Sequence, residues 1–536
     1  MKARLAALLA WLERLASRRL GALVLFVLGL AVYAVQALAW PLGSGRDLDE
    51  YLLAYVQLFD RHVLLPWSLL FRTPLTPLVA GGMLDVFHGA LAEPATGVLF
   101  AGSVVAWSAA ARTFGPRAAL AVAVVLLGYP SYALMFHELS SETTFSAAFA
   151  GWALLVTRAY ARPSSGRWAL VGLGVAVLAY VRPGNAVLLV FVLLPLVFGG
   201  QWRDRLRWAA AFAVAATLPL VAWSVQNGLR YGDYTLARGG NAVVPFYRAF
   251  ITDHIISPKN GPASRKLATA MQEHLLTREP YKAYHVTLAE LFTKGSFRVH
   301  EDLYLLSDQV FGWSSNYQIL RETGIEGVRA HPGTYASGVA DTIWTELDGP
   351  YFRTAGAAKR ETEKQKQART GTVVIGGQRL PKPTEGQPIP GGQVVWISRP
   401  DQSIRQVWTS PTTYYFAFEH PADRARFDAI ERKVGELFGN LPSRAGNAQL
   451  ALRLDQLSRW YPRPWLWILV GVLAIAFRRP RGIGVLVSLA LAAFLVVLLN
   501  ALGLFADPHF IAPVAPAFVL FGLGALLGRK PDPGVG

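Results

Sequence analysis

Ten apolar stretches dominate this chain of 536 residues, of which 53% are hydrophobic. A membrane-spanning helix needs about 20 predominantly apolar residues, and each stretch reaches or approaches that length. The sequence therefore predicts a mainly α, polytopic membrane protein with about ten spans. The predicted spans lie near residues 20–40, 95–112, 117–136, 139–158, 167–182, 184–200, 207–227, 463–477, 482–503 and 509–527.

Arginine marks one side of these spans. The short basic connections all fall on one face, and the positive-inside rule makes that face cytoplasmic. The net charge of +17 comes largely from residues beside spans, so anionic lipid headgroups are the expected partner and nucleic acid is not. We expect a multi-pass protein of the cell membrane. The basic residues are Arg14, Arg18, Arg19, Arg112, Arg117, Arg158, Arg162, Arg167, Arg203, Arg205, Arg207, Arg478, Arg479, Arg481, Arg529 and Lys530.

The spans divide the chain into three predicted parts. The first is a seven-span module, 1–228, whose basic start reads as an uncleaved anchor and whose first outer loop is 41–94. The second is a large mixed α/β domain, 229–462, on the exoplasmic side of the membrane. The third is a three-span segment, 463–536. Cysteine is absent, which excludes disulfides and thiolate chemistry.

Two segments within these parts have distinctive patterns. Residues 74–92 are apolar but contain two prolines, Asp85 and His88, which favours a helix lying at the outer interface over a span. Residues 355–400 contain two short β-branched runs separated by a stretch rich in proline and glycine. That pattern predicts a hairpin on a mobile loop.

An acidic cluster follows the first span. If a helix begins here, Asp47, Glu50 and Tyr51 share one face because they lie three or four positions apart, whereas Asp49 points away. A capping interpretation is also open, with Asp47 as the N-cap and Glu50 three residues later. It leaves a third carboxylate unexplained at a membrane boundary, where charge is costly unless it is used.

The order of several motifs resembles the GT-C superfamily of glycosyltransferases that use lipid-phosphate donors, especially its protein mannosyltransferase and aminoarabinose transferase branch. The resemblance covers residues 10–230 and, less closely, the last span. Two departures are His509-Phe510 in place of Arg-Tyr and an acidic pair split by Leu48. The matching motifs are Asp47 with Tyr51, Arg72-Thr73-Pro74-Leu75-Thr76-Pro77-Leu78, Ser140-Ser141-Glu142, Arg182-Pro183-Gly184 and Asp507-Pro508-His509-Phe510.

This resemblance implies inverting transfer of a sugar from a polyprenyl-phosphate donor to a hydroxyl on the outer face. Asp47 is the expected general base, with Glu50 as its neighbour or substitute. Arg182 and His509 are expected to stabilise the departing phosphate, with Arg72 and Arg46 as further candidates. The remaining candidate substrate-binding residues are Tyr51, His137 and Glu142.

Structural roles remain open for each of these residues. Arg182 could be an interfacial anchor, His509 a cap on the last span and Glu142 a charge placed for the helix dipole. His137 could be a solvated loop residue. A divalent ion held by Asp47 with Asp49 or Glu50, plus His137 or His509, is possible but not favoured, so we expect no cofactor.

Other functions also remain open. A transporter or flippase of a lipid-linked or polyanionic substrate is the main alternative, although the polar groups cluster at one boundary and not near the midplane. A structural protein that binds cell-wall polymer is another. The sugar is not identified, and the acceptor can be a glycan, a lipid or a protein.

Overall fold

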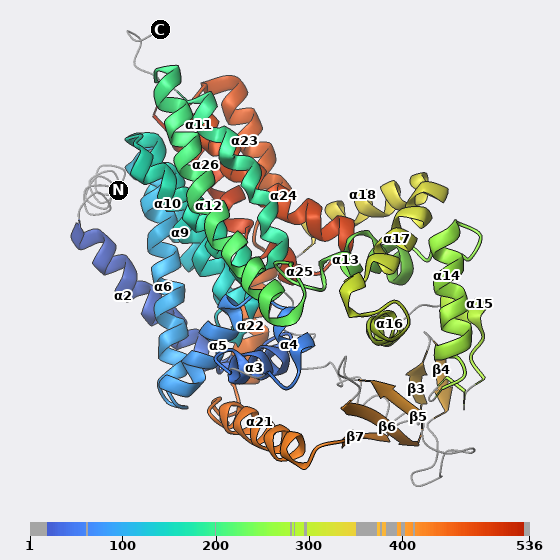
Figure 1. Cartoon of the computed structure of the whole chain (residues 1–536). Helices are drawn as coiled ribbons and strands as arrows, with labels where there is room; N and C mark the ends of the chain where they lie inside the picture. Colours follow the sequence, from blue (N-terminus) through green and yellow to red (C-terminus); the bar gives the residue numbers. More distant parts are fainter. Residues whose placement is uncertain are drawn as a thin grey trace.

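The computed structural model describes residues 19–60, 63–198, 200–278, 281–282, 285–293, 297–349, 372–375, 378–381, 394–397, 403–410 and 413–529. Every predicted apolar stretch is helical, and most of these helices gather into one bundle (Figure 1). Their bounds are α2 Arg19–Ala37, α6 Ala92–Ala111, α7 Pro116–Leu127, α8 Pro130–Leu134, α9 Ser141–Ala161, α10 Ser165–Val181, the 3₁₀ helix η1 Pro183–Leu193, α11 Leu194–Val197, α12 Trp202–Tyr231, α23 Pro464–Arg478, α24 Ile483–Gly503, α25 Pro508–Ile511 and α26 Ala515–Leu527.

The number of spans differs from the prediction. Five helical stretches of the described chain are long and apolar enough to cross a membrane: Leu20–Ala37, Ala92–Ala111, Trp202–Tyr231, Ala448–Arg478 and Ile483–Gly503. The other predicted spans are shorter or interrupted, because glycine and proline break the helix at Gly128–Pro130 and at Pro183. α9 has 21 residues, but it begins with the polar run Ser-Glu-Thr-Thr.

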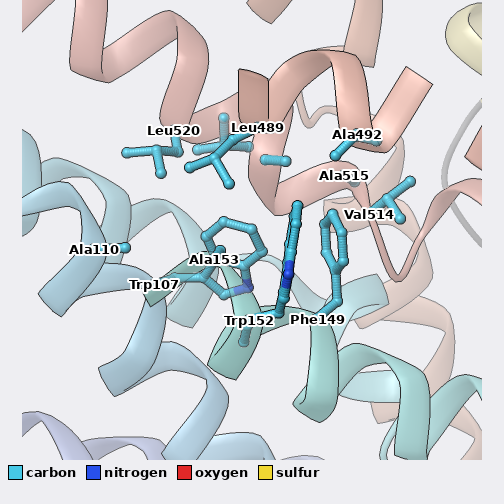
Figure 2. Packing of buried hydrophobic residues seen from close by; sticks show 14 of the residues in the cluster. Trp107, Ala110, Phe149, Trp152, Ala153, Leu489, Ala492, Val514, Ala515 and Leu520 are labelled. Atoms are coloured by element: carbon cyan, nitrogen blue, oxygen red, sulfur yellow. The ribbon is translucent and has the colours of Figure 1, made fainter. Parts of the chain in front are cut away.

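The N-terminal and C-terminal helices share one core. Trp107 of α6 lies against Phe149 of α9, with ring centroids 5.9 Å apart, and Trp152 stacks on Phe149 at 5.6 Å. Alanines on the facing helices leave room for these rings, as is common where helices pack inside a membrane. Figure 2 shows the cluster with its C-terminal members Leu489, Ala492, Val514, Ala515 and Leu520. The predicted seven-span and three-span parts therefore form one bundle.

Large apolar side chains cover the outside of this bundle. They are more than 40% exposed on α2, α12 and α23. Exposed apolar surface of this extent is unusual on a soluble protein but suits contact with lipid tails. Together with the five long apolar helices, it indicates a multi-pass membrane protein. Examples are Leu20, Leu23, Val27, Val214, Leu218, Val221, Leu469, Val472 and Phe477.

The first loop contributes short elements at one end of the bundle. α5 has 12 residues, fewer than a span needs, and it packs on α3 and α6. Its Asp85 accepts hydrogen bonds from Tyr55 at 3.0 Å and Lys433 at 2.7 Å. The elements of this loop are β1 Gly43–Ser44, α3 Leu48–Gln57, α4 Pro66–Leu70 and α5 Leu75–Val86.

Residues 229–462 are mainly helical where the structure describes them, so the prediction of a large mixed α/β domain is wrong for that part. Figure 1 shows α14 to α18 to one side of the bundle, with the strands below them, and α21 and α22 beneath the bundle near α3 and α5. The elements of this part are α13 Gly240–Ala242, the π-helical η2 Val243–Thr252, α14 Pro262–Ala270, η3 Met271–Leu275, α15 Leu288–Thr293, α16 Phe297–Val310, η4 Trp313–Ser315, α17 Gln318–Ala330, α18 Pro332–Asp348, β3 Thr372–Ile375, β4 Gln378–Pro381, β5 Val394–Ile397, β6 Ile404–Ser410, β7 Thr413–Phe418, α21 Pro421–Gly439 and α22 Ala448–Arg459.

The two β-branched runs form the strands β3 and β5, as predicted, but these strands do not pair with each other. β3 pairs with β4, and β5 joins the antiparallel order β5-β6-β7. The hairpin predicted between the two runs is therefore wrong. Apart from β3, β4 and β5, the predicted mobile loop 355–400 lies outside the described residues, as does most of the basic N-terminal segment.

Several basic connections meet at the opposite end of the bundle. The backbone N–H of Arg529 donates to the carbonyl oxygen of Phe114 at 3.0 Å, and that of Arg481 donates to the carbonyl oxygen of Arg529 at 2.9 Å. Gly482 lies against the rings of Phe114 and Tyr160. The connections from α6 to α7, from α9 to α10 and from α23 to α24 are therefore grouped, as the arginine pattern indicated.

The side of the membrane that this end faces can be tested by labelling. The chain has no cysteine, so Arg162→Cys and Lys259→Cys each create a single exposed thiol. In intact cells an impermeant thiol reagent should label position 259, whereas position 162 should react only after permeabilisation. Labelling of 162 but not 259 in intact cells would reverse the orientation and place the site described below in the cytoplasm.

Candidate active site

A short parallel pairing of strands brings two distant segments together. β1 pairs with β2, Glu138–Leu139, with Gly43 opposite Glu138. The backbone N–H of Gly43 donates to the carbonyl oxygen of His137 at 2.8 Å, and that of Gly45 donates to the carbonyl oxygen of Leu139 at 3.1 Å. The acidic cluster after the first span thus lies beside the start of α9, where Glu142 is found.

This pairing depends on glycine at position 45. A Cβ atom there would lie 2.6 Å from Ser140 Cβ and 2.9 Å from the carbonyl oxygen of Leu139. Gly45→Ala should therefore destabilise the protein by about 1–3 kcal/mol through overpacking. Thermal unfolding of the purified protein measures the effect. Gly43→Ala is the matched control, because the closest atom to its Cβ would be 3.9 Å away. Equal melting temperatures for the two variants would contradict the close approach.

The two segments line one cavity of about 1250 Å³. Eight of the nine predicted site residues line this cavity or adjoin it, although they come from five separate segments of the chain. The nine fall into three groups. Arg46, Asp47, Glu50, Tyr51, Arg72, Glu142 and Arg182 line the cavity. His509 lies next to this lining through Asp507, and His137 lies apart.

Asp47 has an unusual backbone conformation. Its φ of 57° and ψ of 22° lie in the left-handed region, which is uncommon for residues other than glycine. Asp47 occupies the position before α3, yet its side chain makes no capping hydrogen bond. The carboxylate lines the cavity instead, so the structure does not support the capping interpretation. Glu50 and Tyr51 also line the cavity while Asp49 is exposed, which confirms the predicted helical face.

Arg72 joins the two candidate catalytic carboxylates. Its Nη2 lies 3.1 Å from Asp47 Oδ2, and its Nε donates to Glu50 Oε2 at 3.1 Å. The guanidinium carbon lies 5.2 Å from the ring centroid of Tyr51. Asp47 is one third exposed, so solvent and a ligand can reach it. One guanidinium thus holds both carboxylates at the cavity surface.

Arg182 occupies a second pair in the same cavity. Its Nη2 lies 2.5 Å from Glu142 Oε1, and its Nε donates to Ser141 Oγ at 3.0 Å. Glu142 has only 3% of its side chain exposed. An arginine presents five N–H groups, and these contacts leave Nη1 for an added anion. Arg182 therefore points into the cavity, which differs from a side chain that reaches outward to the membrane surface.

A third group connects the first loop to the final helices. Arg46 Nη2 lies 2.5 Å from Asp507 Oδ2, and His509 Nδ1 lies 2.7 Å from Asp507 Oδ1. His509 Nε2 is 3.4 Å from Glu138 Oε2. Both ring nitrogens of His509 therefore face a carboxylate, and the ring lies beside the cavity.

His137 does not take part in this cluster. Its side chain is 1% exposed, and its ring stacks on Tyr33 with centroids 4.0 Å apart. Burial is the main cause that lowers the pKa of His137 to about 3, so the ring is neutral. His137 is therefore not a solvated loop residue, and it does not line the cavity.

An apolar wall continues the cavity from Arg182. Pro183 and Gly184 of η1 begin it, and Gly184 lies against Leu499 of α24. These residues belong to helices of the bundle, so the wall runs from the charged groups along apolar helices. Further apolar lining residues include Val181, Ala186, Leu236, Val243, Val244, Val496, Leu504, Phe505 and Phe510.

Two polar residues of the site were missed from the sequence. Asp507 and Ser141 were noted only as members of sequence motifs and not as partners of Arg46 and Arg182. The run Asp507-Pro508-His509 before the last helix was the available signal for Asp507. Among the described residues, no three histidine, cysteine or acidic side chains are grouped so as to hold a metal ion.

Comparison with known proteins finds distant structural likeness only. No protein-family model and no curated protein matches the sequence. The chain is similar to ArnT from Cupriavidus metallidurans bound to undecaprenyl phosphate, with a TM-score of 0.34 and 13% identity over 96% of this chain and 79% of that chain. It is also similar to the oligosaccharyltransferase of Archaeoglobus fulgidus, with a TM-score of 0.28 and 11% identity over 93% of this chain and 63% of that chain. Both are GT-C enzymes, but likeness at this level assigns the chain to no family.

Proposed function

We propose that this protein is a membrane glycosyltransferase that moves a sugar from a polyprenyl-phosphate donor to an acceptor hydroxyl, with inversion at the anomeric carbon. The observation that carries the proposal is the composition of the cavity. Carboxylates, arginines and an apolar wall adjoin one another in it. A lipid phosphate that carries a sugar needs these three surfaces, and the motif order resembles that of GT-C enzymes.

The apolar wall suits the lipid tail. It begins at Pro183, directly after Arg182, and includes Val496 and Leu499 of α24. If the phosphate binds at Arg182, its polyprenyl chain would lie along apolar helices. Burial of the chain there removes its apolar surface from water. Arginine binds phosphate through paired N–H groups, which gives a fixed orientation. A preorganised cation also stabilises the charge that gathers on the departing phosphate.

The carboxylates suit the acceptor side. The acceptor oxygen forms a bond with the anomeric carbon while the bond between that carbon and the phosphate oxygen breaks. The hydroxyl proton passes to Asp47, and polyprenyl phosphate leaves with its charge held by arginine. Arg72 holds the Asp47 carboxylate in position, and Glu50 on the same arginine is the alternative base. Attack opposite to the leaving phosphate gives inversion.

Transfer of radiolabelled sugar is the direct test. Purified protein in lipid is incubated with polyprenyl-phosphate-[¹⁴C]mannose, and with the corresponding arabinofuranose donor, in the presence of membrane extract as the acceptor source. The proposal expects label to move from the lipid phosphate to a new product. Movement of intact donor across a vesicle membrane without cleavage would instead support a flippase. Cell-wall polymer binding without either event would support a structural role.

A further inference from the structure

The cavity has a second region beyond Arg72, which is lined by aromatic rings. Phe71 is the ring next to the charged groups, because the guanidinium carbon of Arg72 lies 5.5 Å from its centroid. The Phe71 and Tyr304 centroids are 5.1 Å apart, and Tyr304 lies at the same distance from Tyr317. All three rings line the cavity, as does Trp313. We call Phe71, Tyr304, Trp313 and Tyr317 the aromatic wall.

Buried ion pairs hold the aromatic wall in place. Arg238 is 1% exposed and lies behind it, with its guanidinium carbon 3.6 Å from the Trp313 centroid and 4.6 Å from that of Tyr317. It donates to Asp233 at 2.9 Å and to Asp308 at 2.5 Å. Trp313 and Tyr317 are therefore held in place before any ligand arrives, which reduces the entropy that binding must overcome.

The charge of this region differs from that of the catalytic end. Asp302, Asp308 and the amide of Gln309 line the cavity beside the aromatic wall, whereas Arg238 does not line it. Asp302 accepts a hydrogen bond from Tyr281 at 2.5 Å, and Asp308 accepts from Arg238 and Tyr317. A carboxylate has about four lone-pair sites, so further hydroxyl donors can be accommodated. An anionic ligand would be repelled.

We propose that the aromatic wall, with Asp302, Asp308 and Gln309, binds a neutral sugar ring of the acceptor. Aromatic faces pack against the C–H face of a sugar, while carboxylates and amides accept and donate hydrogen bonds to its hydroxyls. A phosphorylated or carboxylated ring does not suit two carboxylates. Phe71 connects this region to Arg72, which contacts Asp47, so a hydroxyl of the bound sugar would face the proposed base.

The role of the sugar as acceptor rests on the proposed function, but its binding does not. The assignment narrows the open acceptor classes to one, a glycan. It also gives a role to α16 and η4, which supply Asp302, Tyr304, Asp308 and Trp313 to the cavity. A lipid acceptor without a sugar would not need these residues.

Saturation-transfer NMR on the full chain in phospholipid nanodiscs tests the binding. The probes are methyl α-mannopyranoside and methyl α-arabinofuranoside, with glucuronate and glucose 6-phosphate as anionic counterparts. We expect transfer to the ring protons of the neutral glycosides and little to the anionic sugars. No transfer to the neutral glycosides, or equal transfer to both kinds, would overturn the inference.

Variants of the aromatic wall locate the binding. Tyr304→Ala should weaken glycoside binding about tenfold, because an aromatic contact is removed, whereas Tyr304→Phe should retain most of it. Tyr234→Ala is the matched control, since Tyr234 is 66% exposed and does not line the cavity. Unchanged affinity in Tyr304→Ala, with folding verified by thermal unfolding, would place the sugar elsewhere and refute the assignment.

A competition experiment separates the acceptor from the donor. Polyprenyl-phosphate-mannose is added to the Asp47→Asn protein, in which turnover is blocked. The glycoside should stay bound, and its displacement would place it at the donor sugar and overturn the acceptor assignment. Failure of the proposed function gives a different pattern: glycoside binding would remain sensitive to Tyr304→Ala while no donor is ever cleaved by the wild-type protein.

Discussion

Asp47→Asn is expected to lower the rate of sugar transfer by roughly 10²–10⁴ while leaving the fold and the affinity for the donor largely intact. The change removes the proton acceptor and keeps the shape. Asparagine also tolerates the left-handed backbone of position 47, where φ is 57°. The ion pair with Arg72 joins partly exposed groups, so its loss should cost at most about 1 kcal/mol. Single-turnover transfer and thermal unfolding measure the two effects separately.

Two further variants make this result specific. Asp49→Asn is the matched control, because Asp49 carries the same group two positions later but is exposed and does not line the cavity. It should retain near wild-type transfer. Glu50→Gln tests the alternative base on the same arginine. If Asp47→Asn stays active while Glu50→Gln is inactive, Glu50 is the base. If both remain active, the carboxylates of α3 are not catalytic.

The local pattern of the first loop was enough to predict much of the charged cluster. Spacing alone placed Asp47, Glu50 and Tyr51 on one face of a helix and turned Asp49 away, and the structure agrees. Helical spacing is a local property of the backbone, so it can be read without knowing the tertiary structure. Arginine patterning likewise grouped the basic connections at one end of the bundle.

The partners of these residues could not be read in the same way. Arg46 and Asp507 are separated by 461 positions, and they meet because the final helices pack into the N-terminal bundle. β1 and β2 have two residues each, too few to produce an alternating pattern, yet they align Gly45 with the start of α9. The structure pairs Asp47 and Glu50 with Arg72, and Glu142 with Arg182, although these partners lie 22 or more positions away.

The predictions of strand pairing and of an exposed His137 failed for related reasons. β-branched runs predicted strands at 372–375 and 394–397, but their partners β4 and β6 are richer in polar residues and gave no signal. His137 follows a span and looked exposed, but the turn after α8 places it against Tyr33. Both outcomes depend on tertiary contacts that a single sequence does not display.

The buried ion pair of Arg182 determines how its role can be tested. Arg182→Ala alone would leave Glu142 without its cation at 3% exposure, and an unpaired buried charge costs about 3–5 kcal/mol. Loss of activity in that variant could therefore reflect unfolding. The double variant Arg182→Ala/Glu142→Gln removes both charges, and Glu142→Gln alone is its control. Arg182→Lys keeps the charge but lacks the two-pronged geometry.

With folding verified in this way, the double variant is expected to lose about 10²–10³ in turnover and to bind polyprenyl phosphate more weakly, because the cation that meets the departing phosphate is gone. Arg182→Lys should give intermediate activity, and Glu142→Gln should retain donor binding. Isothermal titration with polyprenyl phosphate and transfer assays measure the two effects. If the folded double variant keeps both donor affinity and turnover, Arg182 serves only to balance Glu142. Arg72, which lies against Asp47 and Glu50 in the same cavity, would then be the cation that receives the phosphate.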